Sequence, residues 1–273
     1  MSAIHPAAHI DPTAQLAPDV RVGPGAVVGP RCSLAEGCVL HPGAYVLRDA
    51  TLGERVEVYP GAVVGGAPQD LKFDDSQPAG VEIGAGTVIR ENATVSLGTL
   101  DPQPTRVGAS CMLMEGAHVG HNSQLADHVI IANSAKLAGH VRVGERCFIS
   151  ALALVHQFVD IGELCMFQGY AGVSMHIPPF VLVGAGANAG VVGLNRVGLK
   201  RSGLYKADDL AQIKDCFKRY YRGRDRAGWA SDEALAEMRE LATLPGAERF
   251  VGFIEAALAQ EAPRARGVIG PAG

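Results

Sequence analysis

Aliphatic side chains recur at every sixth position through most of this chain, and this period restricts the fold more than any other feature of the sequence. Steps of six meet only Ile, Leu or Val at eleven consecutive positions over residues 4–64. The same frame holds for three positions over 83–95 and for twelve over 107–173, with one Phe among them. Two insertions, near 66–80 and 98–105, separate these runs. The repeat predicts short strands that each bury one aliphatic side chain, with a turn after each strand.

The position two residues before each aliphatic residue is mostly small, and five of the six cysteines occupy it. Free cysteine packs as a small hydrophobic residue, and the chain has no C-x-x-C pair, so we expect these thiols to be buried and reduced. Glycine often follows the aliphatic residue, and the chain has 34 glycines but only 5% aromatic residues. Such a composition fits a narrow interior with repeated turns. The five cysteines are Cys32, Cys38, Cys111, Cys147 and Cys165.

The period predicts an all-β fold, a parallel β-helix of hexapeptide repeats over residues 1–203. Three hexads close one triangular coil of eighteen residues in such proteins, so the repeats correspond to nearly nine coils. The left-handed winding is an expectation from the resemblance to hexapeptide-repeat proteins, because parallel connections elsewhere are right-handed. After residue 203 helical spacing replaces the period. It predicts a C-terminal α-helical subdomain over 204–273, which covers the open end of the solenoid.

Two helices of that subdomain have recognisable starts in the sequence. Ser231 can cap a helix that reaches Met238, and Pro245 can open another helix that runs through Leu258. The last residues, 265–273, are expected to be loose, as chain ends often are.

Charge and hydropathy exclude several classes of protein. A net charge of −4 and a pI near 6.1 argue against a general nucleic-acid binder. The N-terminus lacks a basic stretch followed by a long apolar run, so no secretory signal is expected. The uncharged stretch 181–195 is short and contains four glycines, so it does not predict membrane insertion. We therefore expect a cytoplasmic protein.

Stacking by eighteen residues predicts a cluster of polar side chains at one corner of three successive coils, about 4.8 Å apart. The cluster comprises His118, His121, Asn122, Gly139, His140, His156 and Gln157. Four histidines on a rigid scaffold indicate acid–base chemistry. Two other interpretations remain open: turn residues that only bind water, and a zinc site built on the H-x-x-H spacing of His118 and His121 with ligands from adjoining subunits.

Seven segments carry a resemblance to a known family. They are QDLK (69–72), IRE (89–91), AHVGH (117–121), NSAKLAGHV (133–141), VHQF (155–158), IPPFV (177–181) and NRVGLKRSG (195–203). Together they resemble the UDP-N-acetylglucosamine acyltransferases, which perform the first step of lipid A synthesis. The likeness covers nearly the whole chain, including both insertions and the helical end.

The resemblance implies a homotrimer with active sites in clefts between neighbouring β-helices. A 3-hydroxyacyl chain would pass from acyl carrier protein to the 3-position of the UDP-sugar, without cofactor or metal. His121 would be the general base, and the backbone N–H of Gly139 would stabilise the oxyanion. Gly169 would help to limit acyl-chain length. The implied substrate-binding residues are Asp70, Lys72, His118, Asn122, His140, His156, Gln157, Asn188, Asn195 and Arg201.

Several positions depart from the family pattern. His121 is followed by Asn122, where the family usually has Asp, and Asn cannot supply the charge that stabilises an imidazolium. This departure leaves open a 3-amino sugar acceptor, which would give an amide. The other departures are Leu97 for an Arg, Asn188 for a His, Val197 for a Glu and Ser202 for an Arg. Together with Asn122, they leave open a non-catalytic scaffold that binds acyl carrier protein or nucleotide. The H-x-x-H spacing of His118 and His121 leaves open a zinc hydrase.

The segment 196–226 is strongly basic, with ten Lys or Arg against four Asp in a chain of net charge −4. A localised positive patch would steer an acidic partner such as acyl carrier protein. A solvated helix face accounts for the same charges equally well.

Overall fold

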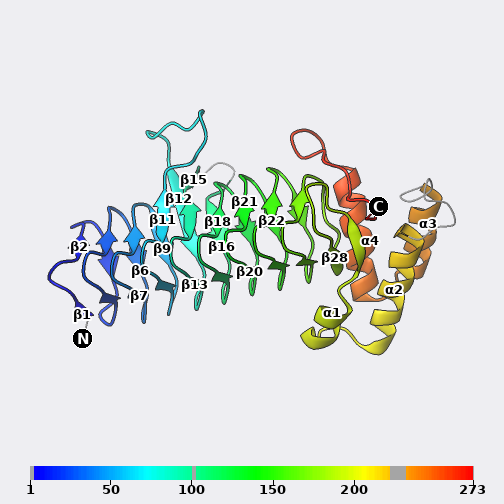
Figure 1. Cartoon of the computed structure of the whole chain (residues 1–273), viewed down its shortest axis with the longest axis horizontal. Helices are drawn as coiled ribbons and strands as arrows, with labels where there is room; N and C mark the ends of the chain where they lie inside the picture. The colour runs from blue at the N-terminus through cyan, green and yellow to red at the C-terminus, as the bar shows by residue number, and fades with distance from the viewer. Residues whose placement is uncertain (1–2, 100–102, 222–231, 273) are drawn as a thin grey trace.

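The computed structural model describes residues 3–99, 103–221 and 232–272. Residues 3–183 wind into a three-sided parallel β-solenoid, and the helices gather at the end opposite the N-terminus (Figure 1). The N-cap predicted at Ser231 lies outside the described residues.

Each side of the solenoid is one ladder of short strands, and we call the three ladders face A, face B and face C. Face A contains β1 (Ala3–Ile4), β4 (Arg21–Val22), β7 (Val39–Leu40), β10 (Glu57–Val58), β13 (Val88–Ile89), β17 (Met112–Leu113), β20 (Ile130–Ile131), β23 (Phe148–Ile149), β26 (Met166–Phe167), β28 (Val181–Val183) and β29 (Val191–Leu194). Face B contains β2 (His9–Ile10), β5 (Val27–Val28), β8 (Tyr45–Val46), β11 (Val63–Gly66), β14 (Thr94–Ser96), β18 (His118–Val119), β21 (Lys136–Leu137), β24 (Leu154–Val155) and β27 (Gly172–Val173). Face C contains β3 (Gln15–Leu16), β6 (Ser33–Leu34), β9 (Ala50–Leu52), β12 (Ala79–Ile83), β16 (Thr105–Val107), β19 (Gln124–Leu125), β22 (Arg142–Val143) and β25 (Asp160–Ile161), with β15 (Gly98–Thr99) antiparallel beside β12.

The strand register confirms the predicted coil of eighteen residues. Paired positions such as Arg21 and Val39 are eighteen apart. The insertions lengthen the coil, so that Glu57 pairs with Val88 and Thr94 pairs with His118. The first insertion projects from the solenoid as a loop between β11 and β12 (Figure 1).

The solenoid has about ten turns, one more than the period of six predicted. The difference arises at the last turn, where β28 pairs with β26 so that Val183 lies opposite Phe167, only sixteen residues earlier. Counting in steps of six cannot find a coil that is two residues short.

The interior follows the repeat as expected. The aliphatic residues of the frame are buried from Val22 to Val173, and all six cysteines are buried and free. Burial raises the pKa of the Cys111 thiol to about 11, which keeps it protonated near neutral pH. The third residue after each aliphatic position commonly has a left-handed backbone, for example Asn122 with φ 58° and His140 with φ 61°. Asparagine adopts this conformation more readily than most residues.

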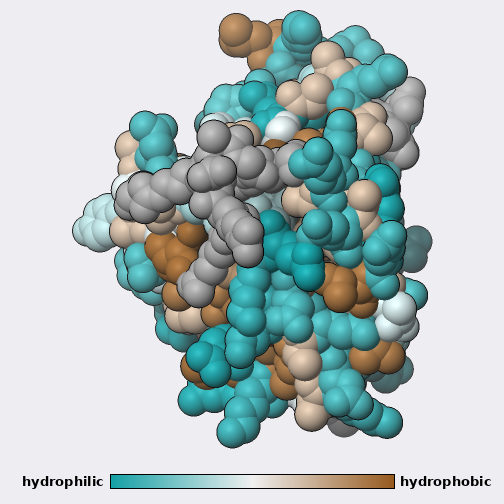
Figure 2. Space-filling model, turned by 90° about the vertical axis from the view of Figure 1, so that its right-hand side faces the viewer, coloured by the Kyte–Doolittle hydropathy of each residue, from teal (hydrophilic) through white to brown (hydrophobic). Residues whose placement is uncertain are grey.

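Four helices follow or overlap the last coil: α1 (Arg196–Ser202), α2 (Ala207–Tyr221), α3 (Asp232–Leu241) and α4 (Pro245–Leu258). The helix predicted from Pro245 to Leu258 is confirmed. Helical structure begins at Arg196, however, earlier than the predicted change at 204, because Asn195 caps α1 by accepting the N–H of Gly198 at 3.0 Å. Seen from this end, the surface is mostly hydrophilic, with small separate hydrophobic patches (Figure 2).

The expectation of a loose C-terminal tail is wrong. Val268 and Ile269 are each 3% exposed, and the N–H of Ile269 donates to the carbonyl of His176 at 2.9 Å. The tail therefore returns along the end of the solenoid and packs on it. Among the residues described, no helix is long and apolar enough to cross a membrane.

Candidate active site

A pocket of about 410 Å³ opens where face B meets face C, over three stacked turns. These turns follow β18, β21 and β24, and they present His121, Gly139 and Gln157 one above another. The pocket is lined by Gln69, Ser96, His118, Gly120, His121, Lys136, Leu137, Ala138, Gly139, Leu154, Val155 and Gln157.

The His121 side chain is oriented by the residue after it. Its Nδ1 lies 3.0 Å from Oδ1 of Asn122. The Asn122 amide nitrogen donates to the carbonyl oxygens of Thr99 at 3.1 Å and Gln103 at 2.9 Å. Because only the nitrogen of an amide can face two carbonyl oxygens, Oδ1 must accept a hydrogen bond from the N–H of His121. The Nδ1 of His121 is therefore protonated, and its Nε2 is left with the free lone pair of a base.

Gly139 lies directly against the His121 ring. A Cβ placed on Gly139 would be 2.5 Å from His121 Nε2, so any side chain here would displace the imidazole. The Gly139 N–H makes no hydrogen bond to any residue that the structure describes. The solenoid does not need this amide, since the same turn position is occupied elsewhere by residues without an N–H. Those residues are Pro6, Pro12, Pro18, Pro24, Pro30, Pro42 and Pro60.

Two further histidines flank His121. His118 Nδ1 lies 2.7 Å from the Thr94 hydroxyl, and burial, followed by Lys136 and His121, lowers the pKa of His118. The His140 ring meets His121 edge-on, with ring centroids 5.0 Å apart, and stacks on Phe158 at 4.7 Å.

Burial is also the main reason why the pKa of His140 is lowered. Electrostatic repulsion by Arg264, and by His121 when it is protonated, adds to this effect, and Asp70 opposes it. Both flanking imidazoles therefore favour the neutral form.

The structure brings most of the predicted corner residues together. His118, His121, Gly139 and Gln157 line the pocket, and Asn122 lies buried behind His121. His140 lies beside His121, and Asp70 is near enough to act on the pKa of His140. Two predicted residues lie on the exposed surface and do not line the pocket. His156 is exposed, with Nδ1 3.2 Å from the Gln157 carbonyl oxygen, and Lys72 is exposed in the projecting loop, where its N–H bonds the Asp70 carboxylate.

Four further predicted residues also lie outside the lining of this pocket in the single chain. The Asn195 side chain caps α1 and donates to the Leu164 carbonyl at 2.9 Å, so it is occupied within the fold. Asn188 is exposed between β28 and β29. Gly169 lies at the corner between faces A and B, where an added Cβ would make ordinary contact, at 3.4 Å, with the carbonyl oxygen of Ala151.

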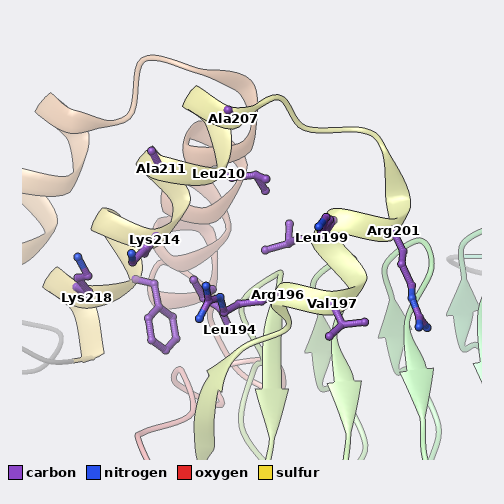
Figure 3. Close-up of a pocket in the computed structure, with 12 residues that line it drawn as sticks. Leu194, Arg196, Val197, Leu199, Arg201, Ala207, Leu210, Ala211, Lys214 and Lys218 are labelled. Carbon is purple, nitrogen blue, oxygen red and sulfur yellow. The ribbon is translucent and has the colours of Figure 1, made fainter.

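Arg201 lines a different hollow, of about 1050 Å³, between α1 and α2. Leu199 and Leu210 point toward one another across this hollow, while Arg201 extends from the far side of α1 (Figure 3). Its basic lining residues are Arg196, Lys200, Arg201, Lys214 and Lys218. The hollow thus combines an apolar floor with a positively charged rim.

Sequence reasoning missed several lining residues. Lys136 and Leu154 follow His118 by one and two coils on face B, so the same stacking rule would have found them. Ser96 could not be found in this way, because the second insertion changes the coil length between β14 and β18. Across the part of the chain that is described, no group of three or more His, Cys, Asp or Glu residues is arranged to hold a metal ion.

Comparisons with known proteins point in one direction. A family model described as UDP N-acetylglucosamine O-acyltransferase, domain 2, matches residues 177–269. An acyl-[acyl-carrier-protein]–UDP-N-acetylglucosamine O-acyltransferase of Anaeromyxobacter sp. (strain Fw109-5) is 40% identical over 193 residues, which are 70% of this chain and 72% of that protein.

Solved structures agree over almost the full length. The UDP-N-acetylglucosamine acyltransferase from Bacteroides fragilis superposes with a TM-score of 0.86 at 31% identity, covering 97% of this chain and 99% of that chain. The corresponding protein from Campylobacter jejuni gives a TM-score of 0.86 at 32% identity, covering 98% and 100%. These enzymes are left-handed β-helices, and the solenoid of this chain has the same fold, as predicted from the sequence.

Proposed function

Because this chain belongs to the family of acyl-[acyl-carrier-protein]–UDP-N-acetylglucosamine O-acyltransferases, we propose that it catalyses acyl transfer in the pocket beside His121. The donor is a 3-hydroxyacyl chain held as a thioester on acyl carrier protein. The acceptor is the 3-hydroxyl of UDP-N-acetylglucosamine, and the reaction is the first step of lipid A synthesis.

The hydrogen bond between His121 and Asn122 is the observation that carries this proposal. It leaves the His121 Nε2 lone pair in the pocket, where it removes the proton from the attacking hydroxyl. The oxygen attacks the thioester carbonyl, and the resulting oxyanion accepts a hydrogen bond from the Gly139 N–H. Collapse of this intermediate forms the ester and breaks the C–S bond. The imidazolium then returns its proton to the leaving thiolate.

Face B offers a path for the acyl chain. Its outward positions beyond His118 are Lys136, Leu154 and Gly172. Leu154 is 58% exposed, which is a large apolar surface for a position next to a polar site. A hydrocarbon chain laid along this face covers Leu154 and ends near the corner that holds Gly169, so its length is limited there.

The outward residues of face A support a homotrimer. Six consecutive outward positions on this face are apolar, and a run of this kind is typical of a surface that packs against another copy. The outward positions of face C are instead mainly polar or charged, as in Gln124 and Arg142. The six face A residues are Val88, Met112, Ile130, Phe148, Met166 and Leu182.

Assembly would also account for Asn195 and Arg201, which a single chain keeps away from His121. We propose that in a trimer α1 of one copy reaches the nucleotide in the pocket of its neighbour. The basic rim of the hollow between α1 and α2 is suited to the phosphates of the UDP-sugar or to the acidic surface of acyl carrier protein.

A 3-amino sugar nucleotide is the second candidate acceptor, and Asn122 is the observation that favours it. An uncharged Asn stabilises the His121 imidazolium less than Asp would, and an amine needs less help from a base than a hydroxyl does. The product would then be an amide.

The test uses the purified chain, the carrier-bound donor and both acceptors in parallel. His121→Ala is expected to reduce kcat with either acceptor by about a hundredfold or more, while His9→Ala, at an exposed position of β2, changes it little. Activity of His121→Ala within a few-fold of the unchanged protein contradicts the proposal. A strong preference for the amine would identify the 3-amino sugar nucleotide as the acceptor, in place of the 3-hydroxyl of UDP-N-acetylglucosamine. Binding of carrier protein or nucleotide without turnover indicates a scaffold, and stoichiometric zinc without acyl transfer indicates a hydrase.

A further inference from the structure

We propose that Arg264, in the C-terminal tail, is a positioning residue for the turn that carries Gly139 and His140. Its Nη2 donates to the His140 carbonyl oxygen at 2.8 Å, across 124 residues of sequence. Its guanidinium also lies over the Phe158 ring, 5.8 Å from the centroid, and Phe158 stacks on the His140 imidazole. The catalytic consequence rests on the function proposed above.

The turn depends on few other bonds. The His140 N–H donates to the His121 carbonyl at 2.9 Å, and the Phe158 N–H donates to the Gly139 carbonyl at 3.2 Å. Among the residues that are described, Arg264 is the one donor to the His140 carbonyl oxygen. His140 has a left-handed φ of 61°, and the bond from Arg264 holds the peptide group that follows it. The bond therefore helps to fix the end of the turn and, with the Phe158 ring, the His140 imidazole that meets His121 edge-on.

Arg264 is itself held firmly in place. Its Nη1 bonds Oδ1 of Asp160 at 2.7 Å, and the other Asp160 oxygen accepts from Gln260 at 2.7 Å. His176, which is fully buried, joins the same network. Its Nδ1 accepts the Asp160 N–H at 3.0 Å, and its Nε2 bonds the Arg264 carbonyl at 2.7 Å. Both the side chain and the backbone of Arg264 are thus tied to the last coils of the solenoid.

Electrostatics agrees with this geometry. Burial, only partly offset by Asp160, lowers the pKa of Arg264, although the guanidinium remains charged in the working range. The groups facing His140 are His121 and Arg264, which lower its pKa in addition to burial, and Asp70, which raises it. Removing the charge of Arg264 should therefore let His140 take up a proton at higher pH, next to the base at His121.

A purely structural role, in which the tail only attaches the helices, predicts a different result. The helices have a separate attachment, since Arg249 on α4 bonds both carboxylate oxygens of Glu163 at 2.9 Å. Glu163 also accepts the Tyr205 hydroxyl at 2.6 Å. Arg249 is therefore a matched control: it is an arginine of the same subdomain, paired with the solenoid, and without contact to the turn of His140.

The experiment compares Arg264→Ala, Arg264→Lys and Arg249→Ala in the full chain. Arg264→Ala is expected to lower kcat by about ten- to a hundredfold with KM for the nucleotide within about twofold, as for a misplaced catalytic group. The lysine variant keeps the charge but loses the planar guanidinium that bonds Asp160 and the His140 carbonyl oxygen together, so it recovers part of kcat. Arg249→Ala leaves kcat unchanged.

The second readout is the titration of the His140 imidazole, followed by NMR without substrate. The pKa of His140 is expected to rise in Arg264→Ala and to stay unchanged in Arg249→Ala. This titration tests the positioning role even if the chain proves to transfer no acyl group. The proposal is overturned if His140 titrates identically in all variants, or if Arg249→Ala reproduces the effects of Arg264→Ala. Should Arg264→Ala fail to fold, Asp160→Asn, which weakens the anchor of Arg264 but keeps its charge, is expected to lower kcat without raising the pKa of His140; unchanged kcat overturns the proposal.

Discussion

Nδ1 of His121 and Oδ1 of Asn122 are 3.0 Å apart. Residues of the second insertion orient the Asn122 amide, and this orientation makes His121 the donor of the hydrogen bond. Carbonyl oxygens of Thr99 and Gln103 accept both protons of the Asn122 amide. An amide at 122 is therefore matched to its surroundings in this chain.

Asn122→Asp should accordingly harm this protein. A carboxylate oxygen would face the two carbonyl oxygens without a proton between them, and a buried group in this situation costs about 1–3 kcal/mol. We expect the free energy of unfolding in urea to fall by about that amount, with a loss of kcat. Unchanged stability together with higher kcat would show that the insertion rearranges and that the amide is not required.

Gly139→Ala should disable the site while leaving the solenoid folded. The new Cβ would lie 2.5 Å from His121 Nε2, so the imidazole must leave its position. A misplacement of about 1 Å at a catalytic group can lower the rate about a hundredfold. Gly252→Ala is the control, because no atom lies within 4 Å of a Cβ there. Steady-state kinetics of the two variants, with circular dichroism as a check on folding, decides the point; near-normal kcat in Gly139→Ala would be incompatible with the proposed geometry.

Stability should depend on the protonation of His118. Burial lowers the pKa of His118 below its ordinary value of 6.5, so below that pH the unfolded chain binds protons more readily than the folded protein. The free energy of unfolding therefore falls as pH drops below about 6.5 and continues to fall until the lowered pKa is passed. His118→Gln should show a smaller fall between pH 7.5 and pH 5 than the unchanged protein in urea titrations. His9→Gln, at an exposed position, should retain the full fall, and an identical response in all three proteins would refute this assignment.

Phe148→Arg should separate the proposed trimer into single chains. The substitution places a charge in the apolar strip of face A, where a packed interface would leave it unpaired. Light scattering should report the monomer mass, and kcat should fall along with the mass if α1 of a neighbour completes the site. Thr51→Lys, on the exposed side of face C, should keep the mass and activity of the unchanged protein. A trimer that persists in Phe148→Arg would locate the interface on another face.

The sequence was sufficient to predict the solenoid because each coil repeats the same physical requirement. One aliphatic side chain in six must be buried, and the strand register follows from that spacing. The last coil escaped prediction because it is two residues short between Phe167 and Val183. The packed tail escaped because its partners are remote: Arg264 and Asp160 are separated by 104 residues, and no local pattern relates them.

The candidate site was predictable to the extent that it is stacked. His121, Gly139 and Gln157 follow the coil of eighteen, and the structure places them together around one pocket. The orientation of Asn122 was not predictable, because it is set by backbone carbonyls of an insertion outside the repeat. Asn195 and Arg201 share no pocket with His121 in the single chain, so their role is a question of assembly that stacking cannot address.

The hydrogen bond from Arg264 to His140 joins two parts of the chain that are far apart in sequence. The turn that holds Gly139 is made 124 residues before the side chain that steadies it. The positioning role proposed for Arg264 therefore makes the corner around His121 depend on a residue that follows every coil of the solenoid in the sequence.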